Sequence, residues 1–293
     1  MLNHLKHHWH HHLTVASMVA LILSFIAGAG AASLLRHGGY KKGPLPPVLA
    51  IAGGKPLPVR WNLARHIVRV HNQGASNSCV GQTLATIMEI THREHYRRRL
   101  AFSSGFIWNQ ASGYQDAGVS YGDAFSLLQT EGDAPLIVFP PDGADRYWTR
   151  PDENALLQAH HHRIRTWRSI SPADRHTIEF ELHAGRPIAI AIPVTDSFYG
   201  NYGRWKVIDR QYGRLYFWHS ITGIGYGPHG VRILNSWGPT WGRNGEAMLS
   251  WSFLSQVNAA VVVSSPRYKR GVGRHTSPGA VPPYQTAPHG RNA

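Results

Sequence analysis

Cys79 is the only cysteine of the 293-residue chain, and it lies in the stretch NQGASNSCVGQTLA at residues 72–85. A free thiol with a pKa of about 8.5 is only a few per cent ionised at pH 7, so a cysteine nucleophile needs help to ionise. An apolar, helix-like pattern follows Cys79 directly, and a sulfur at a helix start would be favoured as thiolate by the helix dipole. The alternative for this cysteine is a buried, inert thiol.

His219 and Asn235 are candidates for the rest of a nucleophilic site. His219 lies in YFWHSITGIGYG, and a histidine that activates a thiol must be held in one tautomer by a third group. Asn235, in ILNSWG on the next expected strand, could be that group. Gln73, six residues before Cys79, could donate its side-chain amide, with the Cys79 backbone N–H, to the oxyanion of an attacked carbonyl. Singly, these residues also fit a packed histidine or a turn asparagine; together they predict attack of a thiol on a carbonyl.

Three stretches of the chain resemble the papain-like cysteine peptidases. NQGASNSC resembles the family's glutamine-to-cysteine segment, HSITGIGYG its histidine strand, and ILNSWGPTWGRNGEAML its asparagine strand and the following turn. A fainter similarity runs through GVSYGDAFSLLQTEGDAPLIVFP, and the resemblance covers residues 57–263. It implies an α+β, papain-like two-lobed fold, with a mainly helical left lobe, an antiparallel β-barrel-like right lobe and a substrate cleft between them.

The resemblance also implies a role for each candidate residue. The catalytic set would be Cys79 as nucleophile, His219 as general base and acid, Asn235 as its orienter and Gln73 as oxyanion donor. Around the cleft, Trp237 would cover the contact between Asn235 and His219, and Trp241 would lie near the leaving-group side. Trp218 and Gly118 complete the expected cleft residues. For both Trp237 and Trp241 the alternative is ordinary core packing.

The chain departs from the family pattern at several positions. Val80 follows the nucleophile where tryptophan is usual, and Ser76 stands where the family often has a cysteine, so the family's disulfides are absent. Trp218 precedes the histidine where a small or polar residue is more usual, which would narrow that entrance. The long inhibitory propeptide of many members is also missing, so any control of activity is expected from elsewhere.

The patterns around these residues predict a helical half followed by a β half. Val80, Leu84, Ile87 and Met88 recur on one face of a helix that begins near Cys79 and that the arginines at 97–99 would close. Further helices are expected to start near Tyr121 and near Ala173. Short strands separated by glycine-rich turns are expected at 186–194, 213–227, 229–237 and 246–251. Such an order is typical of an α+β protein.

The two ends of the chain differ from its middle. The formal charge is +14, but residues 1–60 hold six Lys/Arg and residues 264–293 hold five, with no acid in either. This distribution suits an anionic membrane or cell-wall surface, and without a zinc-finger or RNA-binding signature we expect no nucleic-acid partner. Residues 36–56 are rich in Gly and Pro and are predicted to be a linker, and residues 264–293 a disordered basic tail. Between them, residues 57–263 would form the peptidase domain.

Residues 13–35 carry no charge and predict export. Their apolar centre has the length of a signal-peptide core followed by small residues, whereas the full stretch is long enough for a membrane anchor. The sequence leaves cleaved signal and single-segment anchor open, so residues 1–35 are assigned as signal peptide or anchor. In either case we expect the domain to lie outside the cytoplasm, periplasmic, secreted or anchored.

The leading prediction is an exported, bacterial, monomeric cysteine-type endopeptidase that acts on peptides or proteins through a thioester. An acyl transferase that uses the same intermediate stays open within the enzyme class. The alternative from another class is a catalytically silent papain-like binding module at a membrane or cell wall, which Val80 and Trp218 leave open. No cofactor and no metal are expected. The histidine runs at 7–12 and 160–162 lack a preorganised geometry, since adjacent side chains point in different directions.

Overall fold

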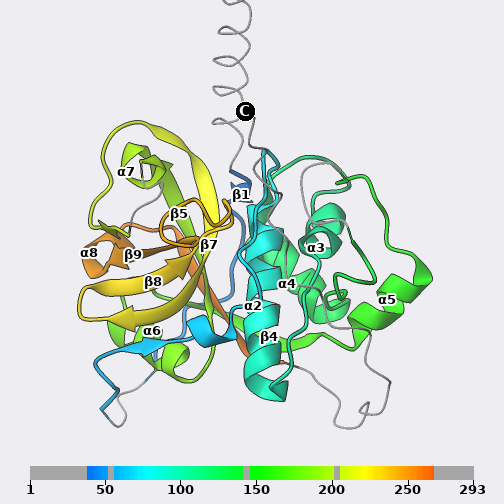
Figure 1. The fold of residues 1–293 in the computed structure, drawn as a ribbon, viewed down its shortest axis with the longest axis horizontal. Coiled ribbons are helices and arrows are strands. Elements are labelled where there is room, and N and C mark those ends of the chain that lie inside the picture. Colours follow the sequence, from blue (N-terminus) through cyan, green and yellow to red (C-terminus); the bar gives the residue numbers. More distant parts are fainter. Residues whose placement is uncertain (1–37, 52–55, 141–145, 201–204, 267–293) are drawn as a thin grey trace, which may run out of the picture.

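The computed structural model describes residues 38–51, 56–140, 146–200 and 205–266. A group of helices lies on one side and a large sheet on the other, and the long helix α2 (Cys79–Tyr96) stands between them (Figure 1). The order along the chain, helices first and most strands later, agrees with the expected α+β class.

The helical half is built from short capped helices around α2. Ser103 caps α3 (Ser104–Ala111) by accepting a hydrogen bond from Phe106 N, and Ser120 caps α4 (Tyr121–Thr130) in the same way. Side-chain caps of this kind satisfy backbone N–H groups that the first helical turn leaves without partners. The remaining helical elements are η1 (Ala64–His66), α5 (Glu153–His160), α6 (Arg175–His183), α7 (Asp196–Tyr199) and α8 (Trp251–Leu254).

The β half is an eight-stranded, mostly antiparallel sheet. Its strand order is β4-β10-β5-β7-β8-β9-β6, and β2 pairs separately with β7. Two further short strands, β1 and β3, pair in parallel with each other outside this sheet. The bounds are β1 (Tyr40–Lys41), β2 (Trp61–Asn62), β3 (Val119–Ser120), β4 (Ile164–Ile170), β5 (Ile188–Thr195), β6 (Val207–Ile208), β7 (Leu215–Gly227), β8 (Gly230–Leu234), β9 (Glu246–Ser250) and β10 (Ala259–Pro266).

Strand β5 separates the two hydrophobic cores because its side chains alternate in size. Ala189 and Ala191 belong to the core of the helical half, whereas Ile188, Ile190 and Ile192 belong to the core of the β half. Successive side chains of a strand point to opposite faces of the sheet. The small alanines therefore let the helices approach one face, while the isoleucines fill the barrel-like interior on the other.

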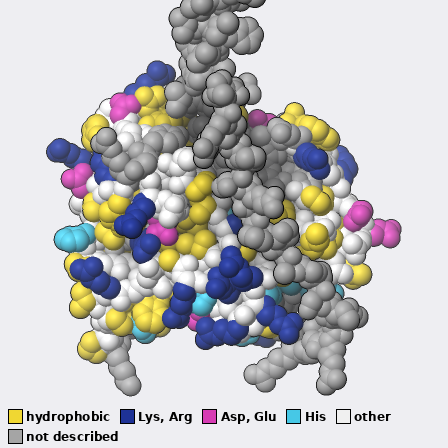
Figure 2. Space-filling view, viewed as in Figure 1, with side chains coloured by type: hydrophobic (Ala, Val, Ile, Leu, Met, Phe, Trp, Pro, Cys, Tyr) yellow, Lys and Arg dark blue, Asp and Glu magenta, His cyan; other side chains and the backbone are white. Residues whose placement is uncertain are grey.

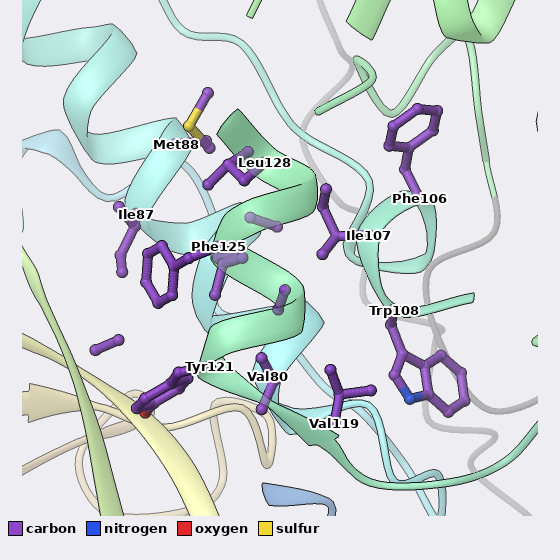
Figure 3. Packing of buried hydrophobic residues seen from close by; sticks show 14 of the residues in the cluster. Val80, Ile87, Met88, Phe106, Ile107, Trp108, Val119, Tyr121, Phe125 and Leu128 are labelled. Carbon is purple, nitrogen blue, oxygen red and sulfur yellow. The ribbon is translucent and has the colours of Figure 1, made fainter. Parts of the chain in front are cut away.

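The core of the helical half packs α2 against α3 and α4. Figure 3 shows Val80, Ile87 and Met88 of α2 with Phe125 and Leu128 of α4 in this cluster. All of these side chains are fully buried. Val80 thus serves as a core residue at the position where the resemblance leads one to expect tryptophan.

Two stretches differ from the sequence expectation. Residues 38–51, predicted to be a linker, have defined partners in the fold: Leu49 N donates to Ser169 O at 3.1 Å, and Ile51 N to Thr177 Oγ1 at 3.1 Å. Glycine and proline content does not reveal such pairing, because the partners lie far away in the sequence. At the other end, strand β10 continues through Pro266, so residues 264–266 belong to the sheet and not to a tail.

The terminal predictions fall largely outside the described residues. This applies to the apolar segment 13–35, the histidine run at 7–12 and residues 267–293. Within the described ranges, none of the helices combines the length and apolar character needed to cross a membrane. Figure 2 shows Lys and Arg side chains gathered over the lower part of the face in view. In Figure 1, which has the same orientation, helix α2 runs toward this lower part.

Candidate active site

Cys79 is the first residue of α2, as the apolar pattern after it predicts, and its side chain is completely buried. Burial raises the pKa of the Cys79 thiol to about 12, although hydrogen bonds from the backbone N–H groups of Ser220, Val80 and Cys79 itself act to lower it. The sequence predicts a lowered pKa at this helix start, and this expectation is wrong for the thiol as it lies here. Loss of water around the sulfur outweighs the favourable backbone groups.

His219 and Asn235 are in direct contact. His219 lies on β7, and Asn235 follows the last residue of β8. The distance from His219 Nε2 to Asn235 Oδ1 is 2.8 Å. The same oxygen accepts a hydrogen bond from Ser236 N at 2.8 Å, which identifies it as the acceptor end of the amide. His219 Nε2 must therefore carry a proton, so Nδ1 is the ring nitrogen able to accept one. The backbone N–H of the next residue, Ser220, reaches the Cys79 sulfur, which places thiol and histidine strand together.

The indole of Trp237 covers the histidine. Its ring centroid lies 4.9 Å from that of His219 with an interplanar angle of 31°. Trp237 is 5% exposed, in agreement with a side chain that keeps water from the contact between His219 and Asn235. Trp241 is fully buried and packs on Phe198 at 4.8 Å and on Trp237 at 5.9 Å, so here it is a core residue of the β half.

Gln73 is buried, and its amide already has partners. Its Oε1 accepts a hydrogen bond from Ser236 Oγ at 2.8 Å. Its Nε2 donates to Ser76 O at 2.8 Å and to Gly38 O at 3.3 Å. Ser236 therefore fixes which end of the amide faces the site, and the donor expected for an oxyanion is in contact with a peptide carbonyl of the same chain.

A chain of buried hydrogen bonds supports the loop before Cys79. Ser76 Oγ donates to Gln73 O at 2.7 Å and lies 2.7 Å from Ser78 Oγ. Gln82 on α2 donates its Nε2 to Ser78 Oγ at 3.1 Å, and its Oε1 lies 2.8 Å from His71 Nδ1. The hydroxyl of Ser76 thus anchors this loop at the position where the resemblance leads one to expect a disulfide cysteine.

Residues 38–42, called the Gly38–Lys42 segment below, pack against Gln73, Asn77 and Phe217 of the candidate site. Strand β1 within it pairs with β3, and Val119 N donates to Gly39 O at 2.7 Å. A Cβ on Gly118, one of the predicted cleft residues, would lie 2.7 Å from Gly39 O, so the segment runs directly over it. The second predicted residue of this region, Trp218, has the Lys42 Nζ 4.6 Å from its ring centroid.

The described residues contain no group of three or more His, Cys, Asp or Glu side chains able to hold a metal ion. In the run at 160–162, His160 lies 3.3 Å from Glu131, and the His162 ring packs at 5.0 Å on Phe102. These histidines point to different neighbours, as adjacent residues generally do.

Several residues of the site are not identified from the sequence. Ser236 stands between two singled-out residues, but only the fold shows that it joins Asn235 to Gln73. Phe217 and Asn258 carry no recognisable pattern, and both touch the Gly38–Lys42 segment. In the sequence this segment is marked by the glycine pair at 38–39, and that composition predicts a linker.

Comparisons with known proteins agree with this arrangement. A family model described as papain family cysteine protease matches residues 56–266. Mouse (Mus musculus) cathepsin K is 24% identical over 207 residues, which is 68% of this chain but only 60% of cathepsin K. The chain therefore spans less than two thirds of that relative.

Solved structures share the fold. Xylellain, a cysteine protease from Xylella fastidiosa, matches with a TM-score of 0.65 and 20% identity over 79% of this chain and 97% of its own. Procathepsin B S9 from Trypanosoma congolense matches with a TM-score of 0.66 and 14% identity over 81% and 88% of the two chains. These similarities confirm the two-part α+β fold expected from the sequence.

Proposed function

Because the chain belongs to the papain family of cysteine proteases, we propose that it is a cysteine-type endopeptidase that hydrolyses peptide bonds through a thioester on Cys79. The observation that carries this proposal is the orientation of His219. Its Nε2 is held at 2.8 Å by Asn235 Oδ1, which leaves Nδ1 as the nitrogen that can take a proton from a thiol. A histidine in ordinary core packing would not need an amide oxygen to fix its tautomer. His219 also lies directly before Ser220, whose backbone N–H reaches the Cys79 sulfur.

In the proposed reaction, the Cys79 sulfur bonds to the carbonyl carbon of the substrate while its proton passes to His219. The oxyanion accepts hydrogen bonds from Gln73 Nε2 and the Cys79 N–H. The C–N bond then breaks as His219 gives its proton to the leaving amine, and a thioester remains. Water loses a proton to His219, attacks the thioester, and releases the acid and the thiol.

This mechanism requires that a substrate carbonyl replace the Gly38 carbonyl beside Gln73. The 3.3 Å contact between Gln73 Nε2 and Gly38 O involves the same N–H that the oxyanion needs. We therefore expect the Gly38–Lys42 segment to leave the site before a substrate enters.

The proposal is tested by hydrolysis of a fluorogenic peptide library by the purified chain, with Cys79→Ala as control. Because Cys79 is the only cysteine, an epoxide probe for thiol peptidases can label no other thiol. Hydrolysis and labelling that both disappear in Cys79→Ala would support the peptidase. No hydrolysis and no labelling of Cys79, both in the folded full chain and in a folded chain that begins at Gly43 and so lacks the Gly38–Lys42 segment, would support the catalytically silent binding module instead.

We further propose that the domain acts outside the cytoplasm, on the basis of the uncharged segment 13–35, which lies beyond the described residues. A phosphatase fused after residue 60 should be active only if this part of the chain is exported. The size of the mature chain would distinguish a cleaved signal from an anchor.

A further inference from the structure

The Gly38–Lys42 segment shows what kind of peptide the site accepts. It places a peptide carbonyl, that of Gly38, at the Gln73 amide. Its next residue pairs with β3 through the hydrogen bond from Val119 N to Gly39 O. The segment therefore follows the surface along which a substrate must lie if Gln73 is the oxyanion donor.

The surroundings of both glycines leave no space for a side chain. A Cβ on Gly38 would lie 2.9 Å from Cδ2 and Cγ of Phe217. A Cβ on Gly39 would lie 1.9 Å from the backbone oxygen of Asn77, and Gly39 also has a φ of +130°, which other residues rarely adopt. At two successive positions, the site is complementary to glycine alone.

The walls that impose this restriction are held in place. Asn77 N donates to Asp116 Oδ1 at 2.8 Å, and Asn77 Nδ2 donates to the same oxygen at 3.2 Å. The ring of Phe217 contacts that of Tyr199, with centroids 5.8 Å apart. Since one wall is a backbone carbonyl and the other a side chain, a substitution can remove only the Phe217 wall.

The third position of the segment accepts a tyrosine. Tyr40 is 6% exposed, and its ring lies 4.8 Å from that of Tyr121. Its hydroxyl donates a hydrogen bond to Asn258 Oδ1 at 3.1 Å. A pocket that encloses the tyrosine ring and ends in a hydrogen-bond acceptor distinguishes tyrosine from phenylalanine, since phenylalanine would lose the hydrogen bond to Asn258 Oδ1.

We propose that the site selects peptides in which a tyrosine adjoins a pair of glycines, with Phe217, the Asn77 carbonyl and Asn258 as the selecting groups. This inference rests on the proposed function, because it assumes that a substrate follows the path of the Gly38–Lys42 segment. The segment runs parallel to β3, and a substrate could run in either direction, so both Tyr-Gly-Gly and Gly-Gly-Tyr are probes.

The steric part of the proposal is tested in the full chain by alkylation of Cys79 with iodoacetamide, which requires no peptidase activity. Gly38→Ala and Gly39→Ala should each displace the segment from the site. Alkylation should then be faster by about 10-fold or more, which is the change expected when a modest steric overlap destabilises the bound segment. Phe217→Ala should restore slow alkylation in Gly38→Ala, where only a 3.1 Å contact to Cβ would remain, but not in Gly39→Ala. Lys41→Ala, on an exposed side chain of the same segment, is the matched control.

The substrate part is tested with the full-length Gly39→Ala chain, because in this variant the Gly38–Lys42 segment should no longer occupy the site. Peptides of equal length contain Tyr-Gly-Gly or Gly-Gly-Tyr, with either glycine changed to alanine or tyrosine changed to phenylalanine. The better of the two orders should protect Cys79 from alkylation at concentrations about 10- to 100-fold lower than its alanine forms. Tyrosine should exceed phenylalanine by about 3- to 10-fold, and Asn258→Ala should abolish that difference.

The two readouts separate this inference from the proposed function. Equal protection by glycine and alanine peptides, or no protection by any of them, would overturn the selectivity. Rescue of both glycine variants, or of neither, by Phe217→Ala would overturn the assignment of the walls. Selective protection without hydrolysis of any peptide would leave the selectivity standing and contradict the peptidase.

Discussion

Asn235 Oδ1 receives two hydrogen bonds, from the His219 ring and from Ser236 N. The second bond holds the amide in place, so the first can fix the tautomer of the histidine. Trp237 packs on the same ring at 4.9 Å and limits its rotation independently of the amide. Orientation of the base is thus shared between two side chains, whereas proton transfer depends on His219 alone.

We therefore expect Asn235→Ala to lower kcat less than His219→Ala does. Loss of the histidine removes general base and general acid together, which costs about 100- to 10,000-fold in proton transfer. Without Asn235, the ring would still be held by Trp237 and would face the thiol part of the time. Steady-state hydrolysis of a fluorogenic peptide by both variants measures the difference. An Asn235 variant as inactive as the histidine variant would mean that the amide, and not the indole, sets the ring.

Ser236 is expected to act on catalysis through Gln73. Its hydroxyl donates to Gln73 Oε1 at 2.8 Å, and without it the amide can turn its nitrogen away from the site. Gln73→Ala should lower kcat by about 100- to 1000-fold with little change in KM, since the oxyanion exists only in the transition state. Ser236→Ala should lower kcat by a smaller factor.

The double variant provides the control for this positioning role. If Ser236 acts only through Gln73, then adding Ser236→Ala to Gln73→Ala should cause no further loss of kcat. Independent, multiplying effects of the two substitutions would show that Ser236 supports the site by another route, such as its backbone bond to Asn235.

At the scale of elements, the sequence predicts those whose pattern is local and periodic. The apolar face that begins at Val80 gives α2, and the alternating alanines and isoleucines of 188–192 give β5. Helix α3 is not predicted, because six consecutive residues from Ser104 to Asn109 are buried and leave no polar face. Strand β4 is not predicted either, since its arginines break the apolar alternation; Arg168 instead pairs with buried Glu181 of α6.

The candidate site also has parts that local sequence patterns predict and parts that they do not. The spacing from Gln73 to Cys79 and the two later motifs identify residues that the fold does bring together. Pairing of residues 38–42 with β3 could not be predicted, because two-residue strands carry no periodicity and their partners are nearly eighty residues away.

The contact between α2 and α3 gives a prediction of stability. A Cβ on Gly81 of α2 would lie 2.3 Å from Ser104 O and 2.7 Å from Trp108 Cβ. Gly81→Ala would gain about 1 kcal/mol of helix propensity, but the overlap is with the Ser104 backbone and with Cβ of the buried Trp108, and it should outweigh that gain. We expect a net loss of about 1–3 kcal/mol in the free energy of unfolding, measured by urea denaturation.

Thr91→Ala on the same helix is the matched control. It also raises helix propensity, and Thr91 is only partly buried, so stability should stay within about 0.5 kcal/mol of the wild type. Identical denaturation midpoints for the two variants would mean that the close approach of the two helices does not constrain the fold.

At the scale of the whole molecule, the candidate site lies where the two cores meet. Cys79 belongs to the core of the helical half, whereas Trp237 belongs to the core of the β half. A hydrogen-bonded row crosses this boundary, from Tyr121 to Ser220 at 2.8 Å and from Ser220 to Thr83 at 2.9 Å. The Gly38–Lys42 segment also touches both halves, through Asn77 on one side and Phe217 on the other. The candidate site is therefore enclosed by three parts of the chain that are distant in sequence, and Cys79 within it is fully buried.

This enclosure should make the reactivity of Cys79 depend on the Gly38–Lys42 segment. Because desolvation is the largest cause of its raised pKa of about 12, the reactive thiolate forms only as the pH approaches that value. In the full chain, the alkylation rate should still rise about tenfold per pH unit at pH 9.5.

In a chain that begins at Gly43, water should reach the sulfur. The positive end of helix α2 and the His219 ring can then favour the thiolate. Its midpoint should fall by more than about one unit, and His219→Ala in that chain should raise the midpoint again. Lys41→Ala in the full chain should leave the profile unchanged. Superimposable profiles for the full and shortened chains would show that the fold of the two halves, and not the segment, keeps the thiol protonated.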